Sequence, residues 1–311
     1  GSSAYDVYVR DLIHGYGTLV ETEAGEFVWD LEQVLAEEPT TETDEAGNKT
    51  YTFKLQDDLK YNNGDPIKAK DYVAGMLLLS SKDWTSISTS ATAGYDLVGY
   101  WDYYQGASTG KDENGKDKFD PNYTVLDKKF KGVRLIDDLT FSLTIDKENL
   151  PYFYETVSVS ASPIHLPTYI PGFDVKDSEE GAYIAKAETN PAAGTIRETI
   201  AETINKPDVG ARFKPLVTAG PYEFVQFKDG TAVVQLNENY KGNYEGKKAT
   251  IQQVQLKEIN QDTDVDQVIA GTIDLVSGVI EGAKIEAAKE SSTADFTSYA
   301  RNGYGLLAMI T

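Results

Sequence analysis

Two histidines, His14 and His165, are the first residues to consider for metal binding or proton transfer, and the chain has no cysteine. The absence of cysteine excludes disulfides, thiol catalysis and cysteine-ligated zinc. Neither histidine has a second histidine or a carboxylate at the spacing that puts two metal ligands on one helix face. We therefore expect no metal site and no cofactor, and we interpret both histidines as isolated surface or capping residues.

The segment "GASTG" at residues 106–110 matches the Gly-x-Ser-x-Gly pattern of hydrolase nucleophiles. That mechanism needs a strand before Ser108 and a helix after it, because the strained turn between them exposes the hydroxyl group. The residues that follow, "KDENGKDKF", are typical of a loop, and those that precede are rich in tyrosine without alternation. We interpret Ser108 as a loop residue and predict no catalytic residue.

Two short segments, "DENGKD" at 112–117 and "DTDVD" at 262–266, bring carboxylates close together. A calcium loop of the EF-hand type needs glycine at its sixth place and a glutamate at its end, whereas Gly115 is fourth here. Asp262 or Asp264 is explained as a helix N-cap. With 50 acidic residues, a pair for glycoside hydrolysis could exist, although none stands out, so a carboxylate-dependent extracellular hydrolase is the alternative from another class.

Aromatic residues are more informative, because 20 of the 311 residues are tyrosine. Tyrosine suits adaptable binding surfaces, since it is large and stiff and has a polar tip. Five rings gather within ten residues and favour two readings equally: they line a groove, or they cover the edge of a core. These residues are Tyr95, Tyr100, Trp101, Tyr103 and Tyr104.

Charge and length limit the function further. The formal net charge of −21 argues against nucleic acid as a partner, because phosphate binding needs clustered lysine and arginine. No apolar run approaches the ~18 residues that span a bilayer. A length of 311 residues favours two lobes over one compact core. We expect a monomer.

The pattern of apolar residues predicts a mixed α/β fold with many hairpins. A short helix and then a strand are expected within 6–22, and a helix is expected just after the turn at 63–66. Hairpins are predicted at 21–29, 40–55, 132–145 and 218–242. In the last of these, we expect Gly220 to provide backbone freedom before the strand.

The remaining segments are less regular. Prolines interrupt residues 151–171, and residues 175–205 are acidic and are predicted to be helical. A short helix ending at Gly271 is expected to be followed by a strand over 273–276. There is no internal repeat and no long linker, so the two lobes are expected to interleave along the chain.

Several segments together resemble the bacterial extracellular solute-binding proteins of the oligopeptide/dipeptide/nickel type, the capture components of ABC importers. The clearest is "KTYTFKLQDDLKYNNGDPIKAKDYVAGM", in which a strand, an Asn-Gly turn, a proline and a helix follow in order. The others are "GVRLIDDLTFSLTIDKENLPYFYETVS", "TAGPYEFVQFKDGTAVVQLNENYKG", "VIAGTIDLVSGV" and, more weakly, "NGYGLLAMIT".

The sequence departs from the family pattern at four positions within these segments. Gln56 stands where a basic residue is usual, and Lys241 where a tryptophan is usual. Lys68 replaces a common threonine, and Thr218 replaces the first glycine of its motif.

The resemblance implies a periplasmic-binding-protein-like type II fold, in which a smaller lobe is inserted into a large one. Residues 1–17 and 206–311 are then expected to form the first lobe, and residues 18–205 the inserted lobe. The further lobe that closes over the ligand is expected to lie outside the chain, because residues 304–311 end in an apolar run typical of a strand inside a longer protein.

The resemblance also implies a function, which is to capture oligopeptides by hinge closure and to deliver them to a membrane permease without catalysis. The protein is then extracellular, anchored as a lipoprotein, or periplasmic. Receptors for a nickel complex or a sugar are alternatives within the family. The expected ligand-binding residues are Tyr95 in the inserted lobe and Ser277, Gly278, Val279, Arg301, Asn302, Gly303 and Tyr304 in the first lobe.

Overall fold

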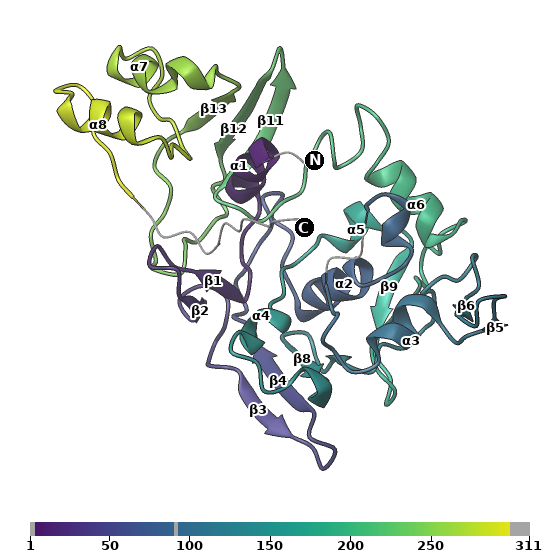
Figure 1. Cartoon of the computed structure of the whole chain (residues 1–311). Coiled ribbons are helices and arrows are strands. Elements are labelled where there is room, and N and C mark those ends of the chain that lie inside the picture. The colour runs from purple at the N-terminus through teal and green to yellow at the C-terminus, as the bar shows by residue number, and fades with distance from the viewer. Residues whose placement is uncertain (1–3, 90–92, 299–311) are drawn as a thin grey trace.

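The protein is described by a computed structural model, in which residues 4–89 and 93–298 are placed. Within these residues the strands form five separate sheets, each of them antiparallel (Figure 1). Helices α7 and α8 lie at one end beside the sheet of β11, β12 and β13, and most of the chain between residues 30 and 205 forms the other end.

The largest core surrounds a four-stranded sheet of order β3-β4-β8-β7. Helix α2 packs on β7 and β8, and the ring of Tyr72 stacks on that of Phe141 with centroids 5.5 Å apart. Phe141 in turn stacks on Phe53 at 4.9 Å. Phe53 lies on β4 and Phe141 on β8, so the hairpin predictions at 40–55 and 132–145 are confirmed. The elements are β3 (Thr40–Thr43), β4 (Lys49–Lys54), α2 (Ala69–Leu79), β7 (Val133–Leu135) and β8 (Thr140–Ile145).

Residues 175–205 are helical only in their last third, so that prediction was mostly wrong. A hairpin of β9 and β10 comes first, and it turns at Gly181, whose φ of 129° favours glycine. The carboxylate of Asp177 before the turn accepts hydrogen bonds from Arg134 and from the backbone N–H of Leu135, which attaches the hairpin to β7. The elements are β9 (Phe173–Lys176), β10 (Tyr183–Lys186) and α6 (Ile196–Thr203).

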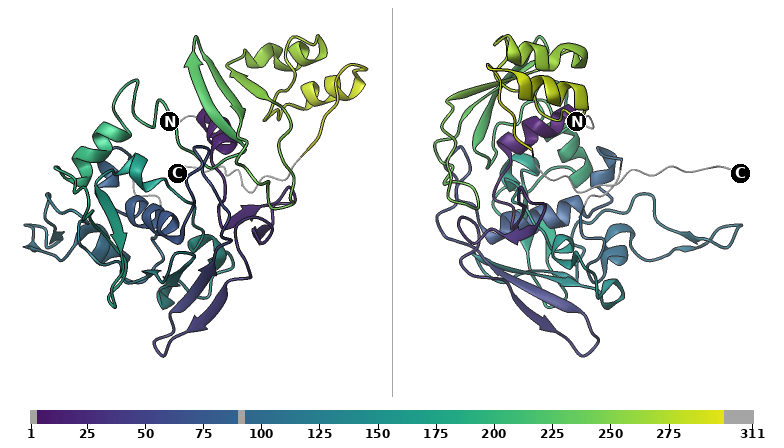
Figure 2. Two further views of the ribbon diagram at one scale, coloured as in Figure 1. Left: turned by 180° about the vertical axis from the view of Figure 1, so that it is seen from behind. Right: turned by 60° about the vertical axis from the view of Figure 1, so that its left-hand side comes forward.

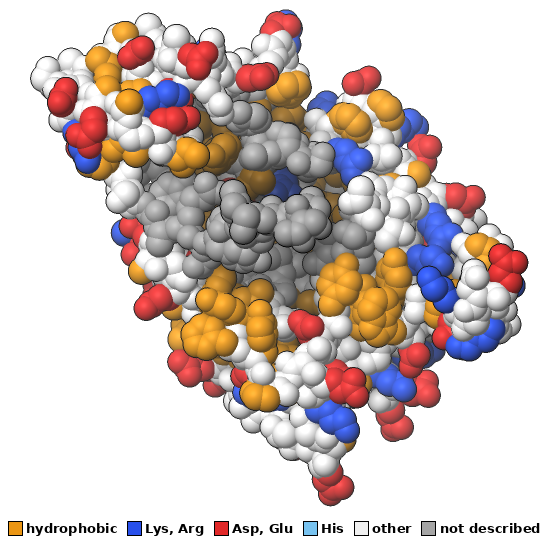
Figure 3. All heavy atoms as spheres, in the orientation of Figure 1, with side chains coloured by type: hydrophobic (Ala, Val, Ile, Leu, Met, Phe, Trp, Pro, Cys, Tyr) orange, Lys and Arg blue, Asp and Glu red, His pale blue; other side chains and the backbone are white. Residues whose placement is uncertain are grey.

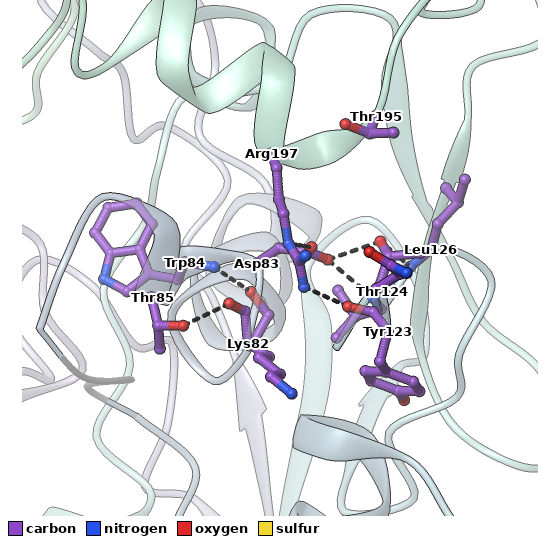
Figure 4. A network of polar contacts seen from close by, with 12 residues as sticks. Lys82, Asp83, Trp84, Thr85, Tyr123, Thr124, Leu126, Thr195 and Arg197 are labelled. Atoms are coloured by element: carbon purple, nitrogen blue, oxygen red, sulfur yellow. Dashed lines mark hydrogen bonds and ion pairs between the residues drawn. The ribbon is translucent and has the colours of Figure 1, made fainter. Parts of the chain in front are cut away.

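A buried ion pair fastens α6 to the segment that follows α2. The carboxylate of Asp83, fully buried, lies 2.7 Å from Nε of Arg197 (Figure 4). Its other oxygen accepts hydrogen bonds from the Thr124 hydroxyl group at 2.8 Å and from the backbone N–H of Val125 at 2.9 Å. The pair thereby holds three distant segments together.

Short elements complete this end of the molecule. The hairpin of β5 and β6 projects from the body (Figure 2). Asp112 closes its turn by accepting hydrogen bonds from the backbone N–H groups of Asn114 and Lys116, so this carboxylate of the "DENGKD" segment stabilises the turn. The elements are β1 (Leu19–Glu21), β2 (Phe27–Trp29), η1 (Trp84–Ser86), α3 (Tyr100–Gln105), β5 (Gly110–Lys111), β6 (Asp117–Lys118), η2 (Lys147–Asn149), α4 (Glu155–Ser158) and α5 (Leu166–Tyr169).

A second, smaller core lies between α1 and the three-stranded sheet of order β11-β12-β13. Ile13 of the helix packs with Tyr222 and Val234 of the predicted hairpin. Gly220 does not have a positive φ, so our expectation of backbone freedom was wrong. A Cβ atom there would lie 2.3 Å from the backbone carbon of Ile13, and close approach explains the glycine. The elements are α1 (Ala4–Ile13), β11 (Tyr222–Lys228), β12 (Thr231–Leu236) and β13 (Gln253–Lys257).

The segment after β13 is helical as predicted, but residues 273–276 form no strand. The chain curls back at the end of α7, where the backbone N–H of Thr272 donates to the carbonyl of Gln267 at 2.9 Å. Leu275 is 81% exposed, and none of the described strands pairs with residues 273–276. Asn260, not Asp262 or Asp264, accepts the capping hydrogen bond in this segment. The elements are η3 (Gln261–Thr263), α7 (Asp264–Ile269) and α8 (Gly282–Glu290).

Asn62 joins the two cores. Its backbone N–H donates a hydrogen bond to the backbone carbonyl of Thr218 at 2.9 Å. Its side-chain oxygen accepts one from the backbone N–H of Thr218, also at 2.9 Å. Its side-chain amide donates to Glu223 at the start of β11, and its carbonyl accepts from Asn239. The Asn-Gly turn predicted at 63–66 therefore begins at a polar contact between distant segments.

Candidate functional site

One group of aromatic rings lies on α3 and just before it in the chain. The buried ring of Tyr100 lies 4.9 Å from that of Tyr95, 5.0 Å from that of Trp101 and 5.6 Å from that of Tyr104. Trp101 is 59% exposed, whereas Tyr103 is buried and stacks on Phe130. The five-residue cluster thus divides between the two readings, because two rings belong to the core edge and three reach the surface.

A second group of rings precedes α4. Phe153 is 90% exposed, and its ring meets Tyr154 edge-on at 4.8 Å. Tyr154 also contacts Tyr152 and, across the chain, Phe27 of β2 at 5.8 Å. Large apolar side chains gathered on a surface mark sites of interaction more often than scattered ones do. These residues were not among the predicted site residues, although the run "PYFY" was the available signal.

A short hydrogen-bond network joins the two groups. Asp96, next to Tyr95, accepts a hydrogen bond from the hydroxyl group of Ser158 in α4 at 2.6 Å. Its backbone carbonyl accepts from the side-chain amide of Asn149 at 3.2 Å. We call the six rings Tyr95, Trp101, Tyr104, Tyr152, Phe153 and Tyr154 the aromatic belt. Hydrophobic side chains gather on this face over the regions of α3 and α4 (Figure 3).

Helix α4 is fixed to the main sheet by a polar contact beneath the belt. One oxygen of Glu155 accepts hydrogen bonds from the ammonium group of Lys49 and from the hydroxyl group of Tyr51, both at 2.5 Å. The Glu155 carboxylate raises the pKa of Lys49. The positive charge of Lys49 is therefore paired with the Glu155 carboxylate, and this contact holds the start of α4, next to Tyr154, on β4.

The predicted site residues do not come together in the described part of the chain. Tyr95 belongs to the aromatic belt. Ser277, Gly278 and Val279 lie in an irregular segment after α7, where a Cβ at Gly278 would be 2.9 Å from the hydroxyl oxygen of Tyr8. Helices α3 and α7 lie at opposite ends of the molecule (Figure 1). Residues Arg301, Asn302, Gly303 and Tyr304 fall outside the described residues.

The histidines are not clustered with other potential metal ligands. His165 is buried at the N-terminus of α5, where Nδ1 lies 2.7 Å from the Thr168 hydroxyl oxygen and Nε2 lies 2.9 Å from the Asp65 carboxylate. His165 occupies the N-cap position of α5, but its side chain makes no capping hydrogen bond to the helix backbone and is not at the surface, so the expected surface or capping role was wrong for this residue. Across residues 4–89 and 93–298, no group of three or more His, Asp or Glu is placed to hold a metal ion.

Two further sequence patterns have structural explanations. The hydroxyl oxygen of Ser108 lies 2.9 Å from the Gly110 carbonyl oxygen and 2.8 Å from the Asp117 carboxylate, so its one hydrogen can be donated to either, in the loop that leads into β5. The loop reading of "GASTG" is therefore confirmed. Among the described helices, none is long and apolar enough to cross a membrane.

The sequence matches the family described as bacterial extracellular solute-binding proteins, family 5, over residues 30–311. The chain belongs to this family. It is 29% identical over 153 residues to the dipeptide-binding protein DppE of Bacillus subtilis, an alignment that covers 49% of this chain and 23% of DppE.

Solved structures share the fold of the family member described here. The OppA protein of Listeria monocytogenes bound to peptide has a TM-score of 0.55 at 17% identity, covering 94% of this chain and 45% of that one. NikZ of Campylobacter jejuni in complex with Ni(L-His) has a TM-score of 0.51 at 15% identity, covering 91% and 41%. The predicted α/β fold of the type II periplasmic-binding-protein class is confirmed, and the chain spans less than half the length of each of these relatives.

Proposed function

We propose that the protein captures oligopeptides as the substrate-binding receptor of an ABC importer and delivers them to a membrane permease. The observation that carries this proposal is membership of the family 5 solute-binding proteins over residues 30–311. The names of its relatives agree with peptide as the ligand, since one is a dipeptide-binding protein and another is an OppA protein bound to peptide.

We further propose the predicted division into lobes, with residues 1–17 and 206–311 in one and residues 18–205 in the other. Two separate buried clusters support this division. The larger lies almost entirely within residues 16–204, and the smaller lies between α1 and the sheet of β11, β12 and β13. Asn62 and its partners then fasten one lobe to the other.

Hinge closure is the proposed mechanism. A ligand that touches two bodies at once favours the closed state by the difference between its affinities for the two states. Peptide backbone would be held by hydrogen bonds and its side chains by surfaces such as the one that includes Tyr95. Ser277, Gly278, Val279 and the segment Arg301–Tyr304 remain the proposed contacts from the other lobe. The receptor acts outside the cytoplasmic membrane, and we propose a lipid anchor or a periplasmic location for it.

Calorimetric titration distinguishes this function from its rivals. A mixture of tetra- to hexapeptides should release or absorb heat on mixing with the protein, whereas nickel–histidine complex and glucose should give only the heat of dilution. Heat with the nickel complex or the sugar, and none with peptides, would assign another solute. Peptide fragments in the mixture after the titration, detected by mass spectrometry, would favour the hydrolase alternative.

A further inference from the structure

The aromatic belt has more exposed ring surface than its structural role requires. Tyr100 and Tyr103 are buried and already close the core edge beside α3. Trp101 and Phe153, by contrast, turn most of their surface to solvent, at 59% and 90% exposure. Rings placed in this way expose apolar area that a ligand can cover, and each adds large contact area at low conformational cost.

Both halves of the belt are held in place by contacts with residues of the protein body. Tyr100 supports Tyr95, Trp101 and Tyr104 through ring contacts, and Glu155 fixes α4 to β4 through Lys49 and Tyr51. The bond between Asp96 and Ser158 joins the halves. A prearranged surface of this kind binds without a large ordering cost.

Charge indicates which ligand suits the belt. The protein carries a net charge of −21, which attracts cations over a distance of about one Debye length, ~10 Å in ordinary buffers. On the belt itself, Asp102 follows Trp101 at the exposed surface of α3. Lys49, the cation under α4, is neutralised by Glu155. Exposed aromatic faces also attract ammonium and guanidinium groups directly.

We propose that the aromatic belt binds the side chains of the transported peptide, and that the preferred peptides carry large apolar or aromatic side chains together with positive charge. This inference rests on the proposed function and names the class of peptide. Ring-to-ring contacts with Trp101 and Phe153 supply the apolar part of the preference, and Asp102 together with the net negative charge of the protein supplies the ionic part.

Fluorine NMR tests the inference directly. Labelling with 5-fluorotryptophan gives one resonance for each of Trp29, Trp84 and Trp101, and the Trp101→Phe variant assigns the exposed one. Lys-Phe-Ala-Phe-Lys should shift the Trp101 resonance and leave that of Trp84 in place. Lys-Ala-Ala-Ala-Lys and Glu-Phe-Ala-Phe-Glu should each bind several-fold more weakly, because one lacks rings and the other lacks positive charge.

Two single variants locate the contact. Phe153→Ala should raise the Kd for Lys-Phe-Ala-Phe-Lys about 3- to 10-fold, as expected for the loss of one aromatic contact. Phe227→Ala removes a ring that is 67% exposed on β11, outside the belt, and should leave the Kd unchanged. Circular dichroism and thermal melts check that both variants fold.

The outcomes separate the inference from the proposed function. Equal affinity for the three peptides, or equal loss in the two variants, overturns the belt as a peptide site while leaving peptide capture intact. Failure of every peptide to bind contradicts the proposed function itself. A shift of the Trp101 resonance with the cationic aromatic peptide and its attenuation in Phe153→Ala supports both.

Discussion

The ammonium group of Lys241 donates a hydrogen bond to the side-chain oxygen of Gln56, 3.3 Å away, and pairs with the Asp58 carboxylate at 2.6 Å. Lys241 follows β12 and Gln56 follows β4, so the contact joins the two proposed lobes. These are two of the four positions at which the sequence departs from the family pattern. Lys241 therefore places a positive charge beside the side chain of Gln56, across the proposed junction.

We expect this junction to contribute a small and measurable stability. Lys241→Ala should lower the free energy of unfolding by about 0.5 to 1 kcal/mol, because its ion pair with Asp58 is partly exposed. Urea denaturation of Lys241→Ala, Asp58→Ala and the double variant gives the coupling between them. Lys247→Ala is the matched control, since its pair with Glu245 is more exposed and should contribute less. Zero coupling would show that the pair does not stabilise the junction.

The buried pair of Asp83 and Arg197 should matter far more. Asp83→Ala leaves the Arg197 guanidinium without its carboxylate and also removes the acceptor of Val125, so we expect a loss of about 3 to 5 kcal/mol. Glu202→Ala at the exposed pair with Lys206 should cost less than about 0.5 kcal/mol. Removing both Asp83 and Arg197 should cost less than the sum of the single losses. Strict additivity in chemical denaturation would rule out the pairing.

Asp71 should make stability depend on pH. Burial raises its pKa from 3.8 to about 6, so the folded protein holds this proton more tightly than the unfolded chain does. The free energy of unfolding should therefore fall by about 3 kcal/mol in total as pH rises from about 3 to about 7, and this fall should be absent in Asp71→Asn. Melts of both proteins at matched pH values measure the difference. Parallel pH profiles would mean that the carboxylate titrates normally in the fold.

Gly220 should not tolerate a side chain. A Cβ there would meet backbone atoms of Leu12, Ile13 and His14 within 2.7 Å, and none of these can move without shifting α1. Gly220→Ala should therefore cost about 2 to 3 kcal/mol. The control is Gly282→Ala at the start of α8, where a Cβ meets no atom within 4 Å and alanine favours the helix. A Gly220→Ala protein as stable as the control would contradict the close packing of α1 on this turn.

Hairpins and the helix after the Asn-Gly turn could be predicted from the sequence, because alternating residues and turn residues act locally. Phe53 and Tyr51 alternate along β4 in the predicted way, and α2 begins just after the turn at 63–66. The strand at 273–276 could not be excluded, since its apolar residues match a strand pattern and only the lack of a partner prevents pairing. The strands β9 and β10 were missed for a related reason. The turn between them is acidic, and its composition resembles that of a helix.

The candidate surface was only partly predictable. Tyr95 was named from the family resemblance, within a stretch rich in tyrosine, but nothing in the local sequence distinguishes exposed Trp101 from buried Tyr103 two residues later. The second half of the belt depends on Tyr154 meeting Phe27, a contact between residues more than a hundred positions apart. The family resemblance indicated the fold and the class of function, whereas the arrangement of the rings required the structure.

Native mass spectrometry with oligopeptides measures the central claim most directly. The protein, mixed with Lys-Phe-Ala-Phe-Lys and sampled over hours, should give a peak at the mass of protein plus one peptide, and the peptide released by acid should retain its full mass. Bound peptide that stays whole is the predicted result for a receptor. Absence of the complex at all concentrations, or progressive appearance of peptide fragments, would contradict the account.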